Sequence, residues 1–304
     1  MAVPDDGRGP IRSVTAGMRS ASLVFDQRME FGVSTFVTDE GIRPDVLGAA
    51  LETRGFDSLF LAEHSHIPIS RESPYPGGGD LPRVYYRTLD PFVALTAAAA
   101  TTSRLILGTG IALQIQRDVI HTAKEVASLD LISRGRVAFG VGVGWNFEEM
   151  RDHGTDPTTR GKLLNEQLEV LKETWTKEQA EFHGELLDFA PFYAWPKPVQ
   201  TPHPPIYIGG ESKGALTRLV EYGNAWLPRA HTPPEELVRV RRWLAEQGRT
   251  DIPFTIFGAG TDKGLLDGYR EAGVERVTFL LKTMPEAETL SKLDELAKVA
   301  DEFR

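Results

Sequence analysis

The 304-residue sequence contains no cysteine. Its absence excludes a disulfide framework, a thiolate metal site and a cysteine nucleophile. A chain without cysteine also suits a reducing compartment, where disulfides are rare. We therefore expect a cytoplasmic protein.

Long apolar runs and net positive charge are also lacking. The longest apolar candidate, residues 92–100, resembles a short alanine-rich helix and falls well below the roughly 20 residues that span a bilayer. The formal net charge is −9, and an acidic chain repels a phosphate backbone or an anionic membrane surface. We expect neither a nucleic-acid partner nor a membrane partner.

The first 28 residues are rich in Gly, Arg, Ser and Pro and show no clear period. They lack the continuous apolar core of a secretory signal. We interpret residues 1–28 as a mobile arm or as sequence upstream of a start at Met29. A docked arm at an oligomer interface is the alternative.

Strand and helix patterns alternate through residues 29–304. Strands are expected at residues 29–36, 58–63, 105–111, 137–144, 206–209, 225–227, 254–257 and 276–281. Helices are expected at residues 43–54, 90–102, 119–132, 159–176, 213–222, 234–247, 263–272 and 285–303. Such alternation indicates a parallel sheet with helical crossovers.

A (β/α)8 TIM barrel and a doubly wound open sheet both satisfy this pattern. Eight units in one uninterrupted series favour the barrel. A doubly wound fold usually has a phosphate-binding fingerprint in its first unit, and residues 31–36 contain none. The sequence therefore predicts one TIM-barrel catalytic domain over residues 29–304.

Two segments interrupt the alternation. Residues 64–88 are rich in Pro, Gly and Tyr and follow a strand, which is where barrel enzymes place active-site loops. Residues 182–200 carry several aromatic side chains. Each segment is interpreted as a lid or as an insertion that covers the barrel surface.

Three short apolar strands end in glycine, within residues 104–110, 136–144 and 205–210. Glycine lets backbone groups approach a ligand because no Cβ stands in the way. Endings of this kind suggest a cofactor at the carboxyl end of a parallel sheet. Three independent tight turns are the alternative.

Glu63 and His64 close the second expected strand, and His66 follows. In an extended chain His64 and His66 share one face, so they could bind zinc with a third ligand such as His121, His153 or a carboxylate. Spacing selects no third ligand. A structural, hydrogen-bonded histidine and a catalytic histidine are the other interpretations.

Gly108, Thr109 and Gly110 close the third strand, as a β-bulge, a tight turn or a ligand contact. Residues 140–145 resemble the dinucleotide pattern G-x-G-x-x-G only loosely, because Trp145 occupies the place of the last glycine.

The residues Gly209, Gly210, Glu211 and Ser212 lead directly into a helix and could cradle a phosphate. A plain strand-to-helix turn is the alternative. Arg160 could supply a cation to a phosphate or could be a surface side chain.

Together these motifs resemble the luciferase-like monooxygenase superfamily, and within it the deazaflavin branch that uses coenzyme F420. The resemblance extends from Met29 over nearly the whole chain. The order of the motifs is specific, although each motif alone is weak. It rests on Glu63–His64, residues 108–110, 123–136, 140–145, Arg160–Gly161, 195–198 and 209–210.

The resemblance implies a TIM barrel and hydride transfer between F420, or alternatively FMN, and a small organic substrate. It implies that His64 acts as the catalytic residue beside the reactive ring, near a bulge with a non-proline cis peptide. Contacts with the cofactor would come from Glu63, Gly108, Thr109, Gly110, Gly144, Trp145, Arg160, Gly209, Gly210, Glu211 and Ser212. The family also makes a homodimer the expected state.

One departure from the branch concerns the substrate. Its sugar-phosphate dehydrogenases carry a glutamate just after the Gly-Thr-Gly motif, whereas residues 111–114 here read Ile-Ala-Leu-Gln. We therefore expect an apolar substrate pocket, with Phe36, Ile111 and Trp145 in its wall. An FMN-dependent monooxygenase, a metal-dependent barrel hydrolase and a non-catalytic flavin-binding protein are the competing functions.

Overall fold

The computed structural model describes residues 28–304, so the interpretation of residues 1–28 falls outside the described residues except for Arg28. Within that range eight parallel strands form one sheet, in the order β8-β7-β4-β3-β2-β1-β10-β9. These are β1 (Glu30–Thr35), β2 (Ser58–Leu61), β3 (Ile106–Thr109), β4 (Val137–Val141), β7 (Ile206–Gly209), β8 (Ala225–Leu227), β9 (Thr255–Ala259) and β10 (Arg276–Leu280).

The two edge strands of this sheet meet and close it. Trp226 forms a parallel bridge with Phe254, and Arg229 forms another with Phe257. The amide of Phe257 donates to the carbonyl of Pro228 at 2.8 Å. The sheet is therefore a barrel, and the prediction of a (β/α)8 TIM barrel is confirmed.

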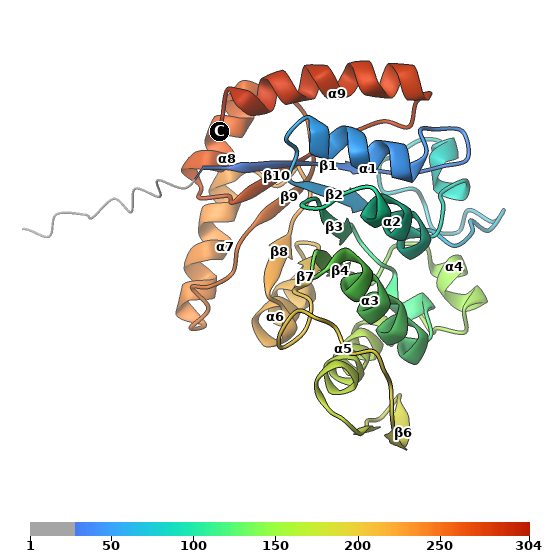
Figure 1. Cartoon of the computed structure of the whole chain (residues 1–304). Helices are drawn as coiled ribbons and strands as arrows, with labels where there is room; N and C mark the ends of the chain where they lie inside the picture. Colours follow the sequence, from blue (N-terminus) through green and yellow to red (C-terminus); the bar gives the residue numbers. More distant parts are fainter. Residues whose placement is uncertain (1–27) are drawn as a thin grey trace, which may run out of the picture.

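Helices surround the outside of the barrel (Figure 1). They are α1 (Pro44–Thr53), α2 (Pro91–Ala100), α3 (Val119–Ser133), α4 (Phe147–Asp152), α5 (Arg160–Thr176), α6 (Lys213–Tyr222), α7 (Pro234–Glu246), α8 (Lys263–Glu271) and α9 (Glu286–Asp301). Helix α2 begins where the sequence predicts a helix. The side chain of Asp90 caps it, because its carboxylate accepts hydrogen bonds from the amides of Phe92 and Val93. Over residues 28–304 none of the helices has the length and apolar character to cross a membrane.

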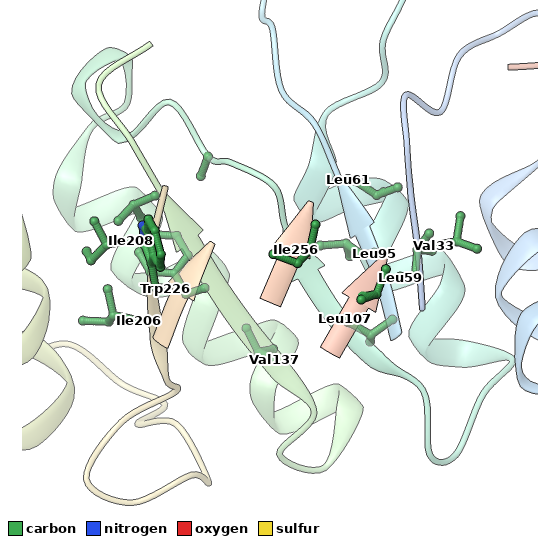
Figure 2. Packing of buried hydrophobic residues seen from close by; sticks show 14 of the residues in the cluster. Val33, Leu59, Leu61, Leu95, Leu107, Val137, Ile206, Ile208, Trp226 and Ile256 are labelled. Atoms are coloured by element: carbon green, nitrogen blue, oxygen red, sulfur yellow. The ribbon is translucent and has the colours of Figure 1, made fainter. Parts of the chain in front are cut away.

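The strands bury both faces in two different layers. Side chains that point outward pack against the helices, among them Val33, Leu59 and Leu107 from neighbouring strands (Figure 2). Side chains that point inward form a second cluster of Phe60, Ala138, Tyr207, Ala225 and Leu227. Successive strand residues alternate between the layers, which explains why the strands read as continuous apolar runs.

The barrel interior is crowded, and glycine makes room in it. A Cβ at Gly140 would lie 2.0 Å from the carbonyl oxygen of Thr109 on the adjacent strand. A Cβ at Gly108 would lie 2.4 Å from the ring of Phe60. These two glycines therefore allow neighbouring strands to pack closely, which is a role separate from that of the glycines that end the strands.

The segment at residues 182–200 is part of an insertion. A two-stranded hairpin of β5 (Ala180–His183) and β6 (Asp188–Phe192) lies beyond α5 (Figure 1). The carboxylate of Glu166 on α5 accepts hydrogen bonds from the amides of Leu186 and Leu187 in its turn. The structure supports the interpretation as a surface insertion over that as a lid.

Candidate functional site

A cavity of about 310 Å³ opens at the carboxyl ends of the strands. Its wall combines glycine backbone from three strand endings with apolar side chains from neighbouring strands. The lining residues are Pro76, Gly110, Ile111, Gly142, Val143, Gly144, Trp145, Gly209, Gly210, Leu227, Arg229 and Phe257. The three glycine endings thus meet at one cavity.

Glycine is required at this cavity because large side chains reach across it. A Cβ at Gly110 would lie 2.2 Å from the Phe257 ring, which comes from β9. A Cβ at Gly142 would lie 2.1 Å from Cδ1 of Ile111. A non-proline cis peptide joins Gly110 to Ile111, at the position that the resemblance implied.

His64 is not among the lining residues, and it reaches this cavity through its contact with Trp145. Its ring centroid is 5.9 Å from that of Trp145, which lines the cavity, and 5.2 Å from that of Tyr85. Its Nδ1 is 2.8 Å from Oε2 of Glu149, a carboxylate whose side chain is fully buried. The other oxygen of Glu149 accepts a hydrogen bond from the amide of Ser65 at 3.2 Å.

Helix α4 also holds the loop at residues 64–88. The carboxylate of Glu148 accepts hydrogen bonds from the amide of Ser73, at 3.0 and 3.2 Å, and from its hydroxyl. Burial raises the pKa of Glu148, but the hydrogen bonds from Ser73 outweigh it and leave the pKa below its ordinary value. This anchored loop brings Pro76 to the cavity.

One charged residue of the cavity lining, Arg229, forms an ion pair. Arg229 donates to the carboxylate of Glu211 at 2.8 Å. Burial raises the pKa of Glu211, and the hydrogen bonds and charge of Arg229 more than offset that effect, so the pKa lies below its ordinary value. Arg229 thereby neutralises the negative charge beside Gly210, which has a φ of 95°.

Some of the predicted site residues lie outside this cavity lining. Glu63 accepts hydrogen bonds from the amide of Leu113 and from Arg117, both at 2.6 Å, and burial raises its pKa against the opposing charge of Arg117. The hydroxyl of Thr109 donates to the carbonyl of Gly140 at 2.7 Å. Each of these residues anchors neighbouring backbone.

Arg160 and Ser212 also make contacts of their own. The guanidinium of Arg160 lies 4.9 Å from the centroid of the Phe147 ring. Ser212 accepts a hydrogen bond from the amide of Ala215 and so begins α6. Five of the predicted cofactor contacts line the cavity together, namely Gly110, Gly144, Trp145, Gly209 and Gly210. Of the predicted apolar wall, Ile111 and Trp145 line the cavity and Phe36 does not.

Sequence reasoning missed Glu149, Leu227, Arg229 and Phe257. Leu227 ends β8 and Arg229 follows it, so barrel geometry alone could have pointed to them, whereas Phe257 is the middle residue of β9. Glu149 follows β4 on a short helix, and its pairing with His64 has no signal in the sequence.

The two histidines that could have shared a metal have separate partners. His64 contacts Glu149, whereas Nε2 of His66 is 3.0 Å from Oδ2 of Asp152. In the part of the chain that the structure describes, no three or more His, Asp or Glu side chains are grouped to hold one ion. The geometry gives the metal-hydrolase alternative no ligand set within residues 28–304.

The family model for luciferase-like monooxygenases matches residues 46–261, and the chain belongs to this family. An uncharacterized protein of Mycobacterium tuberculosis (strain H37Rv) is 39% identical over 259 residues, which are 83% of this chain and 91% of the relative. The oxygenase component of a flavin-dependent trigonelline monooxygenase from Acinetobacter baylyi is 30% identical over 50% of this chain and 42% of its own length.

Solved structures share the fold at low sequence identity. The monooxygenase RslO1 from Streptomyces bottropensis superposes with a TM-score of 0.70 and 19% identity, covering 89% of this chain and 98% of that one. The coenzyme F420-dependent tetrahydromethanopterin reductase from Methanopyrus kandleri gives a TM-score of 0.68 at 17% identity and covers 91% and 100%. Proteins described as a monooxygenase and as a coenzyme F420-dependent reductase therefore share this fold.

Proposed function

We propose that this protein is an oxidoreductase that binds coenzyme F420 in the cavity and transfers a hydride between F420 and a small, apolar organic substrate. The observation that carries the proposal is the convergence of glycine endings from β3, β4 and β7 on one cavity with apolar walls. Such a cavity suits a planar ring, because backbone can approach its face and apolar side chains exclude water.

The residues present fit that group. Ile111, Trp145, Leu227 and Phe257 would enclose the ring in an apolar surrounding. The Gly209–Ser212 segment, with Glu211 neutralised by Arg229, would accept the anionic part of the cofactor. The bound cofactor would supply the hydride chemistry, while the protein orients it and keeps the site dry.

His64 would exchange the accompanying proton. Its ring lies beside Trp145, and a histidine can donate or accept a proton near neutral pH. Such acid–base assistance contributes about 10²–10⁴ in rate.

An FMN-dependent monooxygenase is the second candidate, and the similarity to the trigonelline monooxygenase component favours it. Titrating the purified protein separately with F420 and with FMN discriminates between the two. We expect saturable F420 binding at micromolar or lower concentration and much weaker FMN binding. Tight FMN binding without F420 binding would reverse the order of the two proposals.

A variant that fills the cavity tests its location. Ile111 lines the cavity, is half-buried and packs against the inward-pointing cluster, so Ile111→Trp should abolish binding of the cofactor. Val238→Trp is the matched control, because Val238 is 42% exposed on α7, away from the lining residues. Equal cofactor affinity in both variants would place the ligand elsewhere.

Three further proposals concern the whole protein. We propose a single catalytic domain over residues 29–304, a homodimer and a cytoplasmic location. Sedimentation equilibrium of the full chain tests the dimer, and a monomer at all concentrations would contradict it.

A further inference from the structure

We propose that Glu149 is the positioning residue that fixes the tautomer of His64, so that Nδ1 carries a proton toward Glu149 and Nε2 is the atom that exchanges a proton in the reaction. The assignment of Nε2 as the atom that exchanges a proton rests on the proposed oxidoreductase function. The tautomer itself is a property of the protein alone.

The first support is the geometry of the carboxylate. Oε2 of Glu149 lies 2.8 Å from Nδ1 of His64, and both side chains are at most 6% exposed. An ionised carboxylate only accepts hydrogen bonds, so the nitrogen that faces it must carry the hydrogen. In neutral imidazole, Nε2 is then left as an acceptor.

The second support is that Glu149 is held from both sides. Ser65, the residue after His64, donates its amide to Oε1 at 3.2 Å, and the amide of Glu149 itself donates to Oδ1 of Asn146 at the start of α4. The carboxylate is therefore tied to the same loop that carries the imidazole. His64 also packs against the rings of Tyr85 and Trp145, whose centroids are themselves 6.4 Å apart.

This arrangement makes Glu149→Gln an informative variant. The amide of Ser65 can only donate, so the carbonyl oxygen of the introduced carboxamide must face it. The nitrogen of that carboxamide then faces Nδ1 of His64 and donates to it. A donor at this position forces the proton of the neutral ring onto Nε2, which is the opposite tautomer, with almost no change in shape.

The experiment is ¹⁵N NMR of the full chain with labelled histidine, recorded over a pH series. The sequence contains seven histidines, so His64→Asn identifies the signal. In the neutral form of the wild type we expect a protonated Nδ1 and an unprotonated Nε2, and in Glu149→Gln the reverse. Glu148→Gln is the matched control, because Glu148 binds Ser73 and should leave the His64 tautomer unchanged.

Two results would overturn the proposal: a wild-type His64 protonated at Nε2, or a tautomer that is the same in wild type and Glu149→Gln. If Glu149→Gln does not fold, the wild-type spectrum alone decides. A reversed tautomer without any turnover of F420 would overturn the proposed function and leave the positioning role intact.

Turnover provides the second readout. Once a substrate is found, Glu149→Gln should lower kcat by about 10²-fold or more, because Nε2 then presents a hydrogen instead of a lone pair. The Kd for the cofactor should stay within a few-fold of the wild-type value. An unchanged kcat with a reversed tautomer would remove Nε2 from the chemistry.

Discussion

At the scale of single residues, the surroundings of His64 leave this proposed catalytic side chain little freedom. Two adjacent aromatic rings pack against it, a buried carboxylate binds one nitrogen, and its side chain is only 6% exposed. Burial raises the pKa of Tyr85, so this neighbouring phenol stays neutral at physiological pH. The environment therefore offers His64 one orientation.

Replacing His64 by asparagine tests its chemical role. The carboxamide nitrogen of the introduced side chain can still donate toward Glu149, so the buried carboxylate keeps a partner while the ring nitrogen Nε2 is lost. We expect turnover to fall by about 10²–10⁴-fold, with cofactor binding retained. Steady-state kinetics check this, and His66→Asn is the control, since the His66 side chain is 41% exposed. Wild-type turnover in His64→Asn would exclude acid–base catalysis by His64.

At the scale of elements, the interior-facing glycines decide whether neighbouring strands can approach. Gly140→Ala would place a Cβ 2.0 Å from the backbone oxygen of Thr109, which no side-chain rotation relieves. We expect a loss of about 3 kcal/mol or more in the free energy of unfolding, measured by urea denaturation.

The control for this substitution is Gly264→Ala on the exposed face of α8, where the added Cβ meets only Asp262 Oδ1 at 3.4 Å. It should be neutral or stabilising by up to about 1 kcal/mol, because alanine favours a helix over glycine. A Gly140→Ala variant as stable as Gly264→Ala would contradict the close packing of β3 on β4.

Helix α1 supplies a pH-dependent contact to the next unit. Glu52 accepts hydrogen bonds from the amides of Ser103, Arg104 and Leu105. Burial raises its pKa, but these amides outweigh it and lower the pKa from 4.5 to about 2. The contact therefore stabilises the fold above pH 4.5, and the stabilisation is lost as the pH falls toward 2.

Thermal melts of Glu52→Gln at a series of pH values check this. The variant should be less stable than the wild type near neutral pH, and the difference should shrink as the pH falls toward 2. Glu246→Gln at the exposed end of α7 serves as the control. A difference that stays constant down to pH 2 would contradict the role of the charge.

Most elements of the fold could be predicted from the sequence. The bounds of β7 and α6 agree with the prediction to the residue, because an apolar run and the cap at Ser212 mark them clearly. Helix α4 has only six residues, too few for a helical period to show. Strand β6 contains Pro191, and proline cannot donate a hydrogen bond to a strand ladder, so the sequence does not predict a strand there.

The candidate site could likewise be predicted only in part from the sequence. Glycines at strand ends are visible in the sequence, and the barrel brings them to one cavity. The contact between His64 and Glu149 joins residues 85 positions apart, from the loop after β2 and from helix α4 after β4. Its existence depends on the curvature of the barrel and on the cap of α4, which local patterns do not encode.

At the scale of the whole molecule, the cavity exists only because the barrel closes. Phe257 comes from β9 and Gly110 from the end of β3, and they meet across the interior. The bridges between β8 and β9 hold Phe257 in that position. Binding in this cavity is therefore linked to global folding.

Cofactor binding should accordingly raise the unfolding temperature. At a concentration of about 100 times Kd, a ligand that binds only the folded state stabilises it by about 2.7 kcal/mol. We expect F420 to raise Tm in the wild type and in Val238→Trp and to leave the Tm of Ile111→Trp unchanged, as measured by differential scanning calorimetry. A rise of equal size in Ile111→Trp would show that F420 binds outside the cavity.

Adjacent residues on α4 anchor two parts of the site, since Glu148 secures the 64–88 loop through Ser73 and Glu149 secures His64. A protein engineer who exchanges that loop to alter substrate preference must keep the serine hydroxyl and amide. Without them the loop loses its anchor on the short helix, and Pro76 loses its fixed place at the cavity. Loop grafts in this scaffold should keep ligand affinity when Ser73 is retained and should weaken it when Ser73 is replaced, while the contact between His64 and Glu149 persists.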